Sequence, residues 1–297
     1  MPIEVEAPAK LNLYLGVGGR RADGYHGVET VLVALDLHDS VTVEPAAELS
    51  LVCEPDVGVP APDNLAWRAA VALSSAVGRE SSVAIRVVKR IPARAGLGGG
   101  SADGAAVIAA LAAHWGIASD APVLERVAAS LGADVPFLLR GGCAVYGGRG
   151  DEFVRALPLP GIQFLLVNPG VPVPTAAAYA AFDRMLQPAA PGVRRVADAL
   201  RLEGGAASLG GALFNNMTDA STGLVPEIRE ALALAGRSPG CEGAAMAGSG
   251  STVFGVFDDR ESAEEAVAAA RGRGWWAQVA RPRRGGTLDS VTGAKET

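Results

Sequence analysis

Six consecutive residues, Gly96-Leu97-Gly98-Gly99-Gly100-Ser101, have the composition of a loop that binds phosphate. They follow an alternating segment at 83–87, expected to be a strand, and precede an alanine-rich segment at 101–115, expected to be a helix. At a helix N-terminus the unpaired backbone N–H groups and the helix dipole favour an anion, and glycine lets the backbone approach it closely. The pattern therefore predicts a phosphate site, with ATP as the expected ligand. The alternative is a tight turn that packs a helix onto a sheet.

The better-known phosphate loops do not fit this segment. No Lys-Ser or Lys-Thr pair closes it as in a Walker A loop, and Ser101 occupies the place of the third glycine of a dinucleotide fingerprint. The set of motifs that marks protein kinases is absent from the sequence.

Asp134 is a candidate general base. Transfer of a phosphoryl group needs in-line positioning, neutralisation of charge and a group that accepts the hydroxyl proton. The competing interpretation is structural, because an aspartate two residues before Pro136 is a natural N-cap for a helix that begins at Val135. The pattern alone leaves both roles open, and the two can coexist.

Lys10 and Asn12 lie in an alternating segment at 9–15, expected to be a half-buried strand. The alternation places them with Tyr14 on one face and puts Leu11, Leu13 and Leu15 on the other. A lysine on that face could orient Asp134 and stabilise developing negative charge. It could equally be a solvated surface lysine.

Composition limits the class of protein. The 297 residues carry a net charge of −6, which argues against a long basic surface for nucleic acid. Cys53, Cys143 and Cys241 show no metal-binding or disulfide spacing, so we expect a reducing, cytoplasmic environment. The sequence shows neither a signal peptide nor an apolar run of the roughly 18–20 residues that span a bilayer, so no membrane partner is expected.

The length favours two domains. A proline-rich stretch at 157–161 predicts the hinge, which divides the chain into a first domain at 1–157 and a second at 158–284, followed by a loose polar tail at 285–297. In the second part we expect helices near 175–186 and 193–202, and a glycine-rich turn at 243–250 followed by a strand.

Three motifs resemble those of the GHMP kinases, a family that phosphorylates hydroxyl groups of small molecules. The segment from Pro92 to Ala102 is similar to the family signature P-x-x-x-G-L-G-S-S-A, with Arg94 as a bulky, charged departure. Pro8-Ala9-Lys10-Leu11-Asn12-Leu13 resembles the N-terminal motif, and the segment from Ala247 to Gly255 resembles the C-terminal glycine motif. Motifs in the family's order over most of the chain are more specific than any one of them.

The resemblance implies a mixed α/β (α+β type) fold of two domains with the active site in the cleft between them. It implies ATP as co-substrate and Mg²⁺ as its ion, with Ser101 as the one nearby metal ligand we would suggest. It also implies that Asp134 is the base and Lys10 its catalytic partner. The nucleotide-binding residues expected from it are Asn64, Lys89, Pro92, Ala93, Arg94, Ala95, Gly96, Leu97, Gly98, Gly99, Gly100, Ser101 and Ala102.

Further segments resemble one branch of the family, whose substrate carries a cytidine diphosphate group and whose pathway is non-mevalonate isoprenoid synthesis. They are Arg21-Ala22-Asp23-Gly24-Tyr25-His26, Glu29-Thr30-Val31 and the run from Leu131 to Phe137, although Leu32-Val33 departs from the branch. Phosphorylation of the hydroxyl at the 2-position is the implied reaction.

Tyr25 and His26 are the expected cytosine-binding pair, since an aromatic ring can stack on a base and an imidazole can bond to its edge. Tyr179 is expected on the other side of the base. The remaining substrate-binding residues expected are Asn12, Thr175, Gly248, Ser249 and Gly250. The alternatives are a GHMP kinase for homoserine, mevalonate or a sugar, and a nucleotide-binding protein on this fold that transfers no phosphate; the sequence leaves the oligomeric state open.

Overall fold

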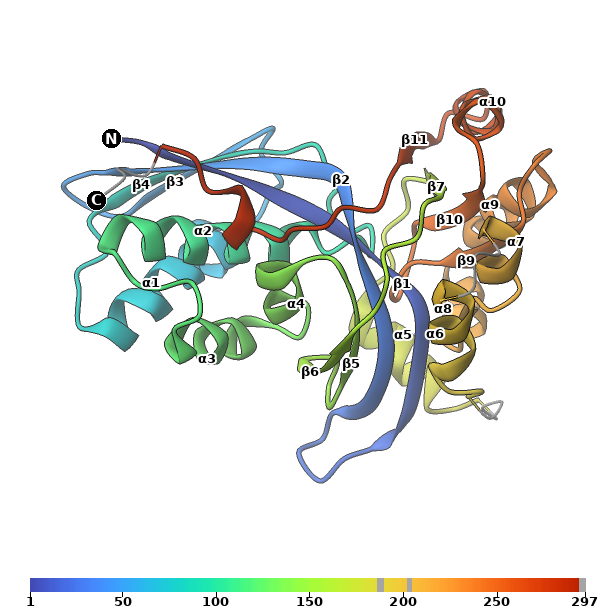
Figure 1. The fold of residues 1–297 in the computed structure, drawn as a ribbon, viewed down its shortest axis with the longest axis horizontal. Coiled ribbons are helices and arrows are strands. Elements are labelled where there is room, and N and C mark those ends of the chain that lie inside the picture. Colours follow the sequence, from blue (N-terminus) through green and yellow to red (C-terminus); the bar gives the residue numbers. More distant parts are fainter. Residues whose placement is uncertain (186–189, 202–204, 294–297) are drawn as a thin grey trace.

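The computed structural model of the protein describes residues 1–185, 190–201 and 205–293, which form two sheets flanked by helices (Figure 1). The first sheet has its central strands in the order β3-β4-β2-β1-β8, with β5 and β6 attached to β2. Its strands are β1 (Ile3–Arg20), β2 (His26–Pro45), β3 (Ser50–Glu54), β4 (Val83–Val88), β5 (Cys143–Gly147), β6 (Glu152–Ala156) and β8 (Phe214–Asn215).

The second sheet is antiparallel with the order β11-β7-β10-β9. Its strands are β7 (Gln163–Asn168), β9 (Gly243–Met246), β10 (Val253–Phe257) and β11 (Trp276–Ala280). The expected strand after the glycine-rich turn is therefore present, but the turn is shorter than expected because Gly243–Met246 pairs with β10.

Helices pack against both sheets (Figure 1). The first sheet carries α1 (Leu65–Val77), α2 (Gly99–Trp115), α3 (Pro122–Leu131) and α4 (Val135–Arg140), with a 3-10 turn η1 (Ala61–Asp63) before α1. The second half contains α5 (Thr175–Phe182), α6 (Arg194–Arg201), α7 (Gly205–Gly210), α8 (Thr218–Leu224), α9 (Glu227–Arg237) and α10 (Arg260–Arg271). These confirm the expected helices, while the expected ends Leu186 and Leu202 lie outside the described residues.

Alternation along β7 explains how the two sheets share a core. Phe164 and Leu166 face the first sheet and pack with Leu11 and Leu13 of β1, whereas Leu165 and Val167 face the outer helices α9 and α10. Both faces of β7 are thereby buried. The boundary predicted at 157/158 falls between β6 and β7, and the division into two domains there remains a prediction.

Strand β1 is buried on both faces from Ala7 to Val17, so the expectation of a half-buried strand was wrong. Its pairing with β2 shifts register between Pro8 and Lys10 and again between Asn12 and Tyr14. The second shift moves Tyr14 into the core that contains Leu11 and Leu13, so Tyr14 does not share the face of Lys10 and Asn12. Irregularities of this kind re-aim side chains next to functional sites, and of these three residues Lys10 and Asn12 border a cavity, whereas Tyr14 is turned into the core.

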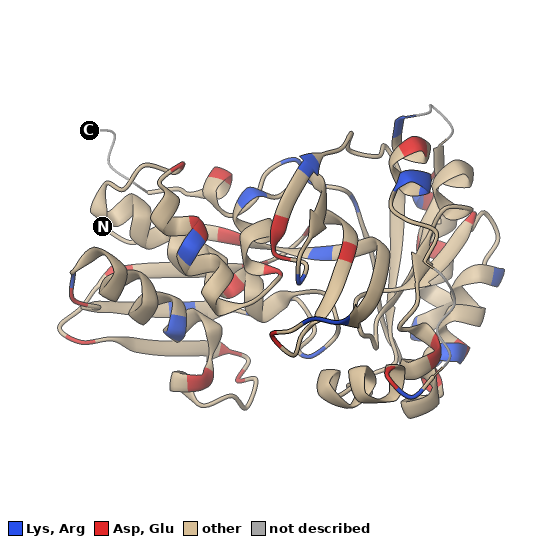
Figure 2. Cartoon of the chain, turned by 90° about the horizontal axis from the view of Figure 1, so that it is seen from below, with Lys and Arg blue, Asp and Glu red and all other residues tan. Residues whose placement is uncertain are grey.

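Acidic and basic residues are interspersed over both halves of the molecule in Figure 2. Among the described residues, no helix has both the length and the apolar character that a membrane span would require.

The segment after Arg281 is not a loose tail, contrary to expectation. It returns across the molecule to lie beside the start of the chain (Figure 1). Thr292 exchanges backbone hydrogen bonds with Glu4, and the Thr287 N–H donates to the Leu138 carbonyl. Thr287 is fully buried, in a segment that continues into the 3-10 turn η2 (Leu288–Ser290). This polar segment is therefore held by backbone pairing at the edge of the first sheet. Residues 294–297 of the expected tail lie outside the described residues.

A chain that ends at Arg284 should therefore lose stability. It lacks the bonds of Thr287 and Thr292, each worth about 0.5–1.5 kcal/mol, and the packing of Leu288 and Val291 on the core. We expect the midpoint of thermal unfolding to fall by about 5–10 °C. A chain that ends at Gly293 keeps all these contacts and is the control. Equal midpoints for the two truncated chains would show that the segment contributes nothing.

Candidate active site

The glycine-rich loop lies between β4 and α2, as predicted, and is clamped from both sides. The Lys10 N–H of β1 donates to the Leu97 carbonyl at 3.0 Å, and the Thr252 N–H donates to the Ala95 carbonyl at 3.1 Å. Gly96 has φ +80°, and a Cβ added there would lie 2.4 Å from the Ala247 carbonyl oxygen. Only glycine fits this contact, which holds the loop against the turn that contains Gly248.

The start of α2 offers backbone donors without a competing side chain. Gly98 is the N-cap residue, in a left-handed conformation with φ +75°, and within the described part of the chain no side-chain cap hydrogen bond is made to the first turn. The N–H groups of the first turn are thus available to an anion, as the sequence predicts.

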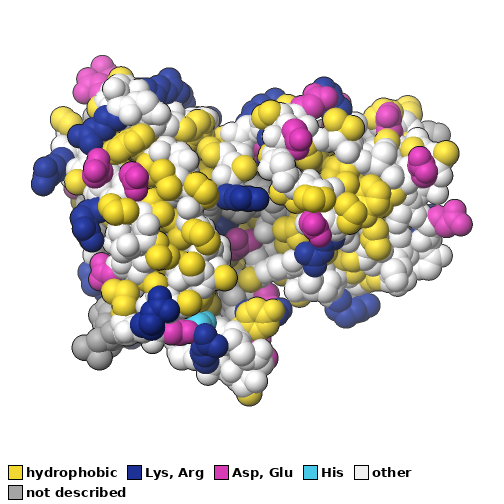
Figure 3. All heavy atoms as spheres, turned by 180° about the vertical axis from the view of Figure 1, so that it is seen from behind, with side chains coloured by type: hydrophobic (Ala, Val, Ile, Leu, Met, Phe, Trp, Pro, Cys, Tyr) yellow, Lys and Arg dark blue, Asp and Glu magenta, His cyan; other side chains and the backbone are white. Residues whose placement is uncertain are grey.

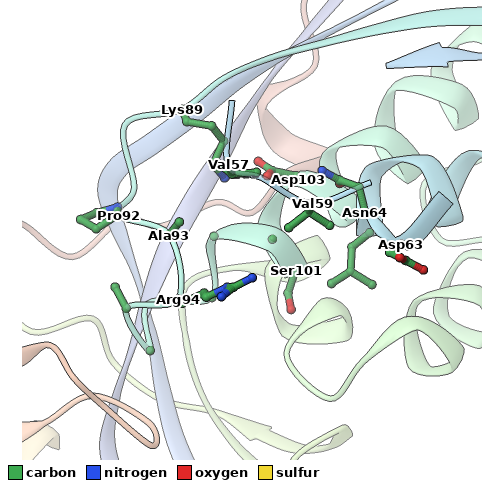
Figure 4. Close-up of a pocket in the computed structure, with 16 residues that line it drawn as sticks. Val57, Val59, Asp63, Asn64, Lys89, Pro92, Ala93, Arg94, Ser101 and Asp103 are labelled. Carbon is green, nitrogen blue, oxygen red and sulfur yellow. Dashed lines mark hydrogen bonds and ion pairs between the residues drawn. The ribbon is translucent and has the colours of Figure 1, made fainter. Parts of the chain in front are cut away.

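One cavity, of about 330 Å³, opens on the outer side of this loop, and Figure 4 shows its lining. It contains most of the predicted nucleotide-binding residues: Asn64, Lys89, Pro92, Ala93, Arg94, Ala95, Gly96, Gly98, Gly99, Gly100 and Ser101. Leu97 and Ala102 are core residues instead, with 1% and 0% exposure. Sequence reasoning missed the apolar wall of Val57, Val59 and Leu65, because short valines beside Gly58 resemble any surface loop.

Lys89 is held by two carboxylates. Its Nζ lies 2.5 Å from Asp39 Oδ2 and 2.6 Å from Asp103 Oδ2, and all three side chains are at least nine-tenths buried. Asp39 also accepts the N–H groups of Arg90 and Ile91 at 2.5 and 2.8 Å, which fixes the chain as it leaves β4. The structure thus places Lys89 at the cavity in a structural role, which its sequence context did not reveal.

The charges of this group depend on one another. Burial raises the pKa of Asp103 to about 7 against the opposing attraction of the Lys89 ammonium. Burial alone would lower the pKa of Lys89, but the attraction of Asp103 and Asp39 outweighs it and the pKa is raised. The ammonium is therefore charged but already neutralised by its own partners.

Asn64 is the N-cap of α1, because its Oδ1 accepts the Ala66 N–H at 2.9 Å. Its Nδ2 contacts Cys53 Sγ at 3.6 Å and borders the cavity. Asn64 therefore caps a helix as well as bordering the cavity.

A second cavity, of about 310 Å³, lies on the other side of the glycine loop. Gly96, Gly98 and Ser101 line both cavities, so the loop separates them. The second cavity also takes residues from both halves of the molecule: Lys10, Asn12, Thr30, Asp134, Arg149, Thr175, Tyr179, Gly248 and Ser249. The space-filling view in Figure 3 shows a hollow between the two lobes.

Lys10 and Asp134 meet in this second cavity, with Lys10 Nζ 3.3 Å from Asp134 Oδ2. Lys10 Nζ also donates to Asn12 Oδ1 at 2.8 Å, and Asn12 Nδ2 donates to Thr30 Oγ1 at 2.9 Å. Asp134 precedes α4 but makes no side-chain cap hydrogen bond, so capping does not explain it. Its side chain is 32% exposed, whereas that of Lys10 is 5% exposed, so the carboxylate is the group that a ligand can reach.

Tyr25 and His26 lie beside the second cavity but do not line it. Tyr25 is 58% exposed, with the Arg149 guanidinium 5.0 Å from its ring centroid, and Arg149 itself borders the cavity. His26 is buried and contacts Asp183, with 2.7 Å between Nε2 and Oδ1. Hydrogen bonds from Arg20 and His26 lower the pKa of Asp183, so the carboxylate accepts and His26 Nε2 is the donor.

His26 and Tyr179 contact each other directly, so no base lies between these two rings, whereas the expected base between Tyr25 and Tyr179 stays a prediction. The ring centroids of His26 and Tyr179 are 5.1 Å apart with an interplanar angle of 37°, which is direct ring contact and leaves no room for a base. Tyr179, on α5, supports His26 while bordering the cavity.

The turn that contains Gly248 approaches Lys10 closely. A Cβ on Gly248 would lie 3.4 Å from Lys10 Nζ, and Thr175 Oγ1 lies 3.4 Å from Ser249 Oγ. Gly250 is outside the cavity lining and packs toward Met246 and Ile228, so its role is to shape the turn. The functional positions that sequence reasoning missed are Thr30, Arg149, Asp39 and Asp103; only Thr30 lies in a segment whose resemblance could have identified it.

Oxygen donors at the loop suit Mg²⁺, which prefers carboxylates, hydroxyls, phosphates and water. Ser101 borders both cavities and Asp134 borders the second. Among the described residues, no three His, Cys, Asp or Glu side chains converge as a metal-binding group. A magnesium ion here would therefore rely mainly on phosphate oxygens and water, which is common for nucleotide-bound magnesium.

Comparison with known proteins agrees with this geometry. Models of the N-terminal and C-terminal domains of GHMP kinases match residues 64–142 and 197–274. Two curated relatives, from Pelotomaculum thermopropionicum and Rhizorhabdus wittichii, are each named 4-diphosphocytidyl-2-C-methyl-D-erythritol kinase. They are 40% and 41% identical over 91% and 95% of this chain and 94% and 95% of their own lengths.

Solved structures give the same fold. A crystal structure of 4-(cytidine 5'-diphospho)-2C-methyl-D-erythritol kinase superposes with a TM-score of 0.78 at 36% identity, covering 94% of this chain and all of that chain. A homoserine kinase from Cytophaga hutchinsonii, at 18% identity and a TM-score of 0.70, covers 97% of this chain and 96% of its own and shares the fold. The mixed α/β fold predicted from the motifs is confirmed. The chain therefore belongs to the GHMP kinase family and, within it, to the 4-diphosphocytidyl-2-C-methyl-D-erythritol kinases.

Proposed function

We propose that the protein transfers the γ-phosphoryl group of ATP to the 2-hydroxyl of 4-diphosphocytidyl-2-C-methyl-D-erythritol. The observation that carries this proposal is the glycine loop between two cavities, with Gly96, Gly98 and Ser101 exposed to both. A nucleotide in the first cavity and an alcohol in the second would meet across these residues. The names of the relatives supply the identity of the alcohol.

The residues divide the chemistry as follows. Asp134 accepts the hydroxyl proton as the oxygen bonds to the γ-phosphorus, the bond to the bridging oxygen breaks, and ADP leaves. Lys10 holds the Asp134 carboxylate and places a positive charge beside the reaction, while Asn12 and Thr30 fix Lys10. The N–H groups at the start of α2 hold phosphate oxygens. Ser101 would help to hold the magnesium ion that accompanies ATP, which would neutralise phosphate charge.

The cytidine would lie at the side of the second cavity bordered by Arg149 and Tyr179, with Tyr25 stacking on the base. His26 keeps Nδ1 for the edge of the base because Nε2 is committed to Asp183. Thr175, Gly248 and Ser249 close the cavity from the second half of the chain. We retain the cytoplasm as the expected compartment, since all three cysteines are free.

Replacing Asp134 by Asn should remove the base but keep the shape of the site. We expect turnover to fall by about 10²–10⁴-fold, with ATP binding retained, measured as ADP released in the presence of the cytidyl substrate. Asp120, an exposed aspartate outside both cavities, provides the control variant Asp120→Asn, which should behave as wild type. Unchanged turnover in Asp134→Asn would exclude it as the base.

Replacing Tyr25 by Ala should weaken binding of the cytidyl substrate because stacking on a base is worth about 1–3 kcal/mol. We expect its KM to rise by about 10- to 100-fold while the KM for ATP stays the same. Tyr25→Phe keeps the ring and should retain most of the affinity. Assays with homoserine, mevalonate and a sugar test the alternative substrates. If ATP binds but ADP release stays at background with every alcohol, the protein does not act as a kinase.

A further inference from the structure

The nucleotide cavity contains two basic side chains, Lys89 and Arg94, among its described lining residues. Lys89 is buried and forms ion pairs with both Asp39 and Asp103, so its positive charge is neutralised within the protein. Arg94 is exposed, and no hydrogen bond or ion pair to another described residue involves its side chain. A triphosphate in this cavity would therefore meet one uncommitted positive charge from a lining side chain, that of Arg94.

The backbone at Arg94 is unusual. It has φ +54°, and within the described ranges it is the only residue other than glycine with a positive φ. This left-handed conformation is unfavourable for a residue with a side chain, and such residues cluster at functional sites. Glycine would adopt this conformation without cost, so an arginine here is consistent with a role for its side chain.

The Arg94 side chain points toward the start of α2. In Figure 4 Arg94 extends along the cavity toward Ser101, in the first turn of α2. Ser101 borders both cavities, so this is the place where the terminal phosphate would pass from one to the other. The guanidinium and the free N–H groups of the helix start thus face the same point.

We propose that the Arg94 guanidinium binds the terminal phosphates of ATP and stabilises the negative charge of the γ-phosphoryl group as it is transferred. This role rests on the proposed kinase function and adds a charged group to it. A guanidinium is suited to the task because its planar set of donors bonds two phosphate oxygens at once. GTPases obtain the same effect from an arginine placed beside the γ-phosphate.

Three variants test this role. Arg94→Gly removes the guanidinium and relieves the left-handed backbone, Arg94→Ala removes it and keeps the strain, and Arg94→Lys keeps a charge without the planar donors. We expect kcat with saturating substrates to fall by about 10²-fold or more in the Gly and Ala variants and by less in the Lys variant. Arg90, an exposed neighbour outside this cavity whose guanidinium bonds to Ser40, provides the control Arg90→Ala, which should keep wild-type kinetics.

Binding gives a second readout that does not need turnover. If Arg94 contacts the γ-phosphate, Arg94→Gly should weaken ATP binding by about tenfold more than ADP binding in calorimetric titrations. Wild-type kcat together with an unchanged ratio of ATP to ADP affinity in Arg94→Gly would overturn the proposal. Equal kcat in the wild type and the Gly variant, with a loss confined to the Ala variant, would also overturn it, because only the backbone would then matter. A wild-type protein without kinase activity would refute the proposed function, while the ATP and ADP titrations would still test Arg94.

Discussion

A buried ammonium group in the middle of a strand is the constraint around which the rest of the site is arranged. Lys10 is 4% exposed, and burial of an unpaired charge costs several kcal/mol, so the fold has to bring partners to it. Asn12 supplies one oxygen from the same strand and Asp134 supplies a carboxylate from the start of α4. Asp134 is more than a hundred residues away in sequence, so the pair forms only when α2 and α4 pack onto β1. The packing that stabilises the buried Lys10 ammonium is therefore the same packing that assembles the site.

The glycines around Lys10 are needed for the same reason, because the backbone comes close to this lysine. An added Cβ at Gly98 would lie 3.0 Å from Lys10 Cγ, one at Gly248 would lie 3.2 Å from the Gly96 carbonyl oxygen, and one at Gly96 would collide with the Ala247 carbonyl. Two loops from opposite halves of the chain therefore converge on one lysine, and side chains would hold them apart. Because of this close approach, only the glycine loop separates the nucleotide cavity from the second cavity. Transfer between two bound ligands depends on that short distance.

Sequence reasoning succeeded where local chemistry decides structure. The strand-loop-helix around Gly96 to Ser101 and the meeting of Lys10 with Asp134 were predicted and are present, the second with help from the family resemblance. It failed where distant partners decide. Strict alternation along a strand cannot predict the register shift that turns Tyr14 into the core. Composition cannot show that the polar segment 285–293 packs back on the fold, with Thr292 paired to Glu4 of β1. The contact between His26 and Tyr179 and the capture of Lys89 by two carboxylates likewise depend on residues far apart in the chain.

The charge balance of the protein limits how it can hold two anionic ligands. A net charge of −6 gives no long-range attraction for ATP or for a cytidine diphosphate, and salt screens exposed charges beyond about 8–10 Å. The binding free energy must therefore come from contacts at short range. The structure offers such contacts in two forms. Backbone N–H groups at the start of α2 add no net charge, and of the few cations beside the cavities, Lys10 and Lys89 are balanced by carboxylates. Neutral donors and paired cations leave little uncompensated charge in the site before ligands bind, so the site can be preorganised without strong repulsion among its own groups. Preorganised dipoles are the main source of electrostatic stabilisation in a transition state.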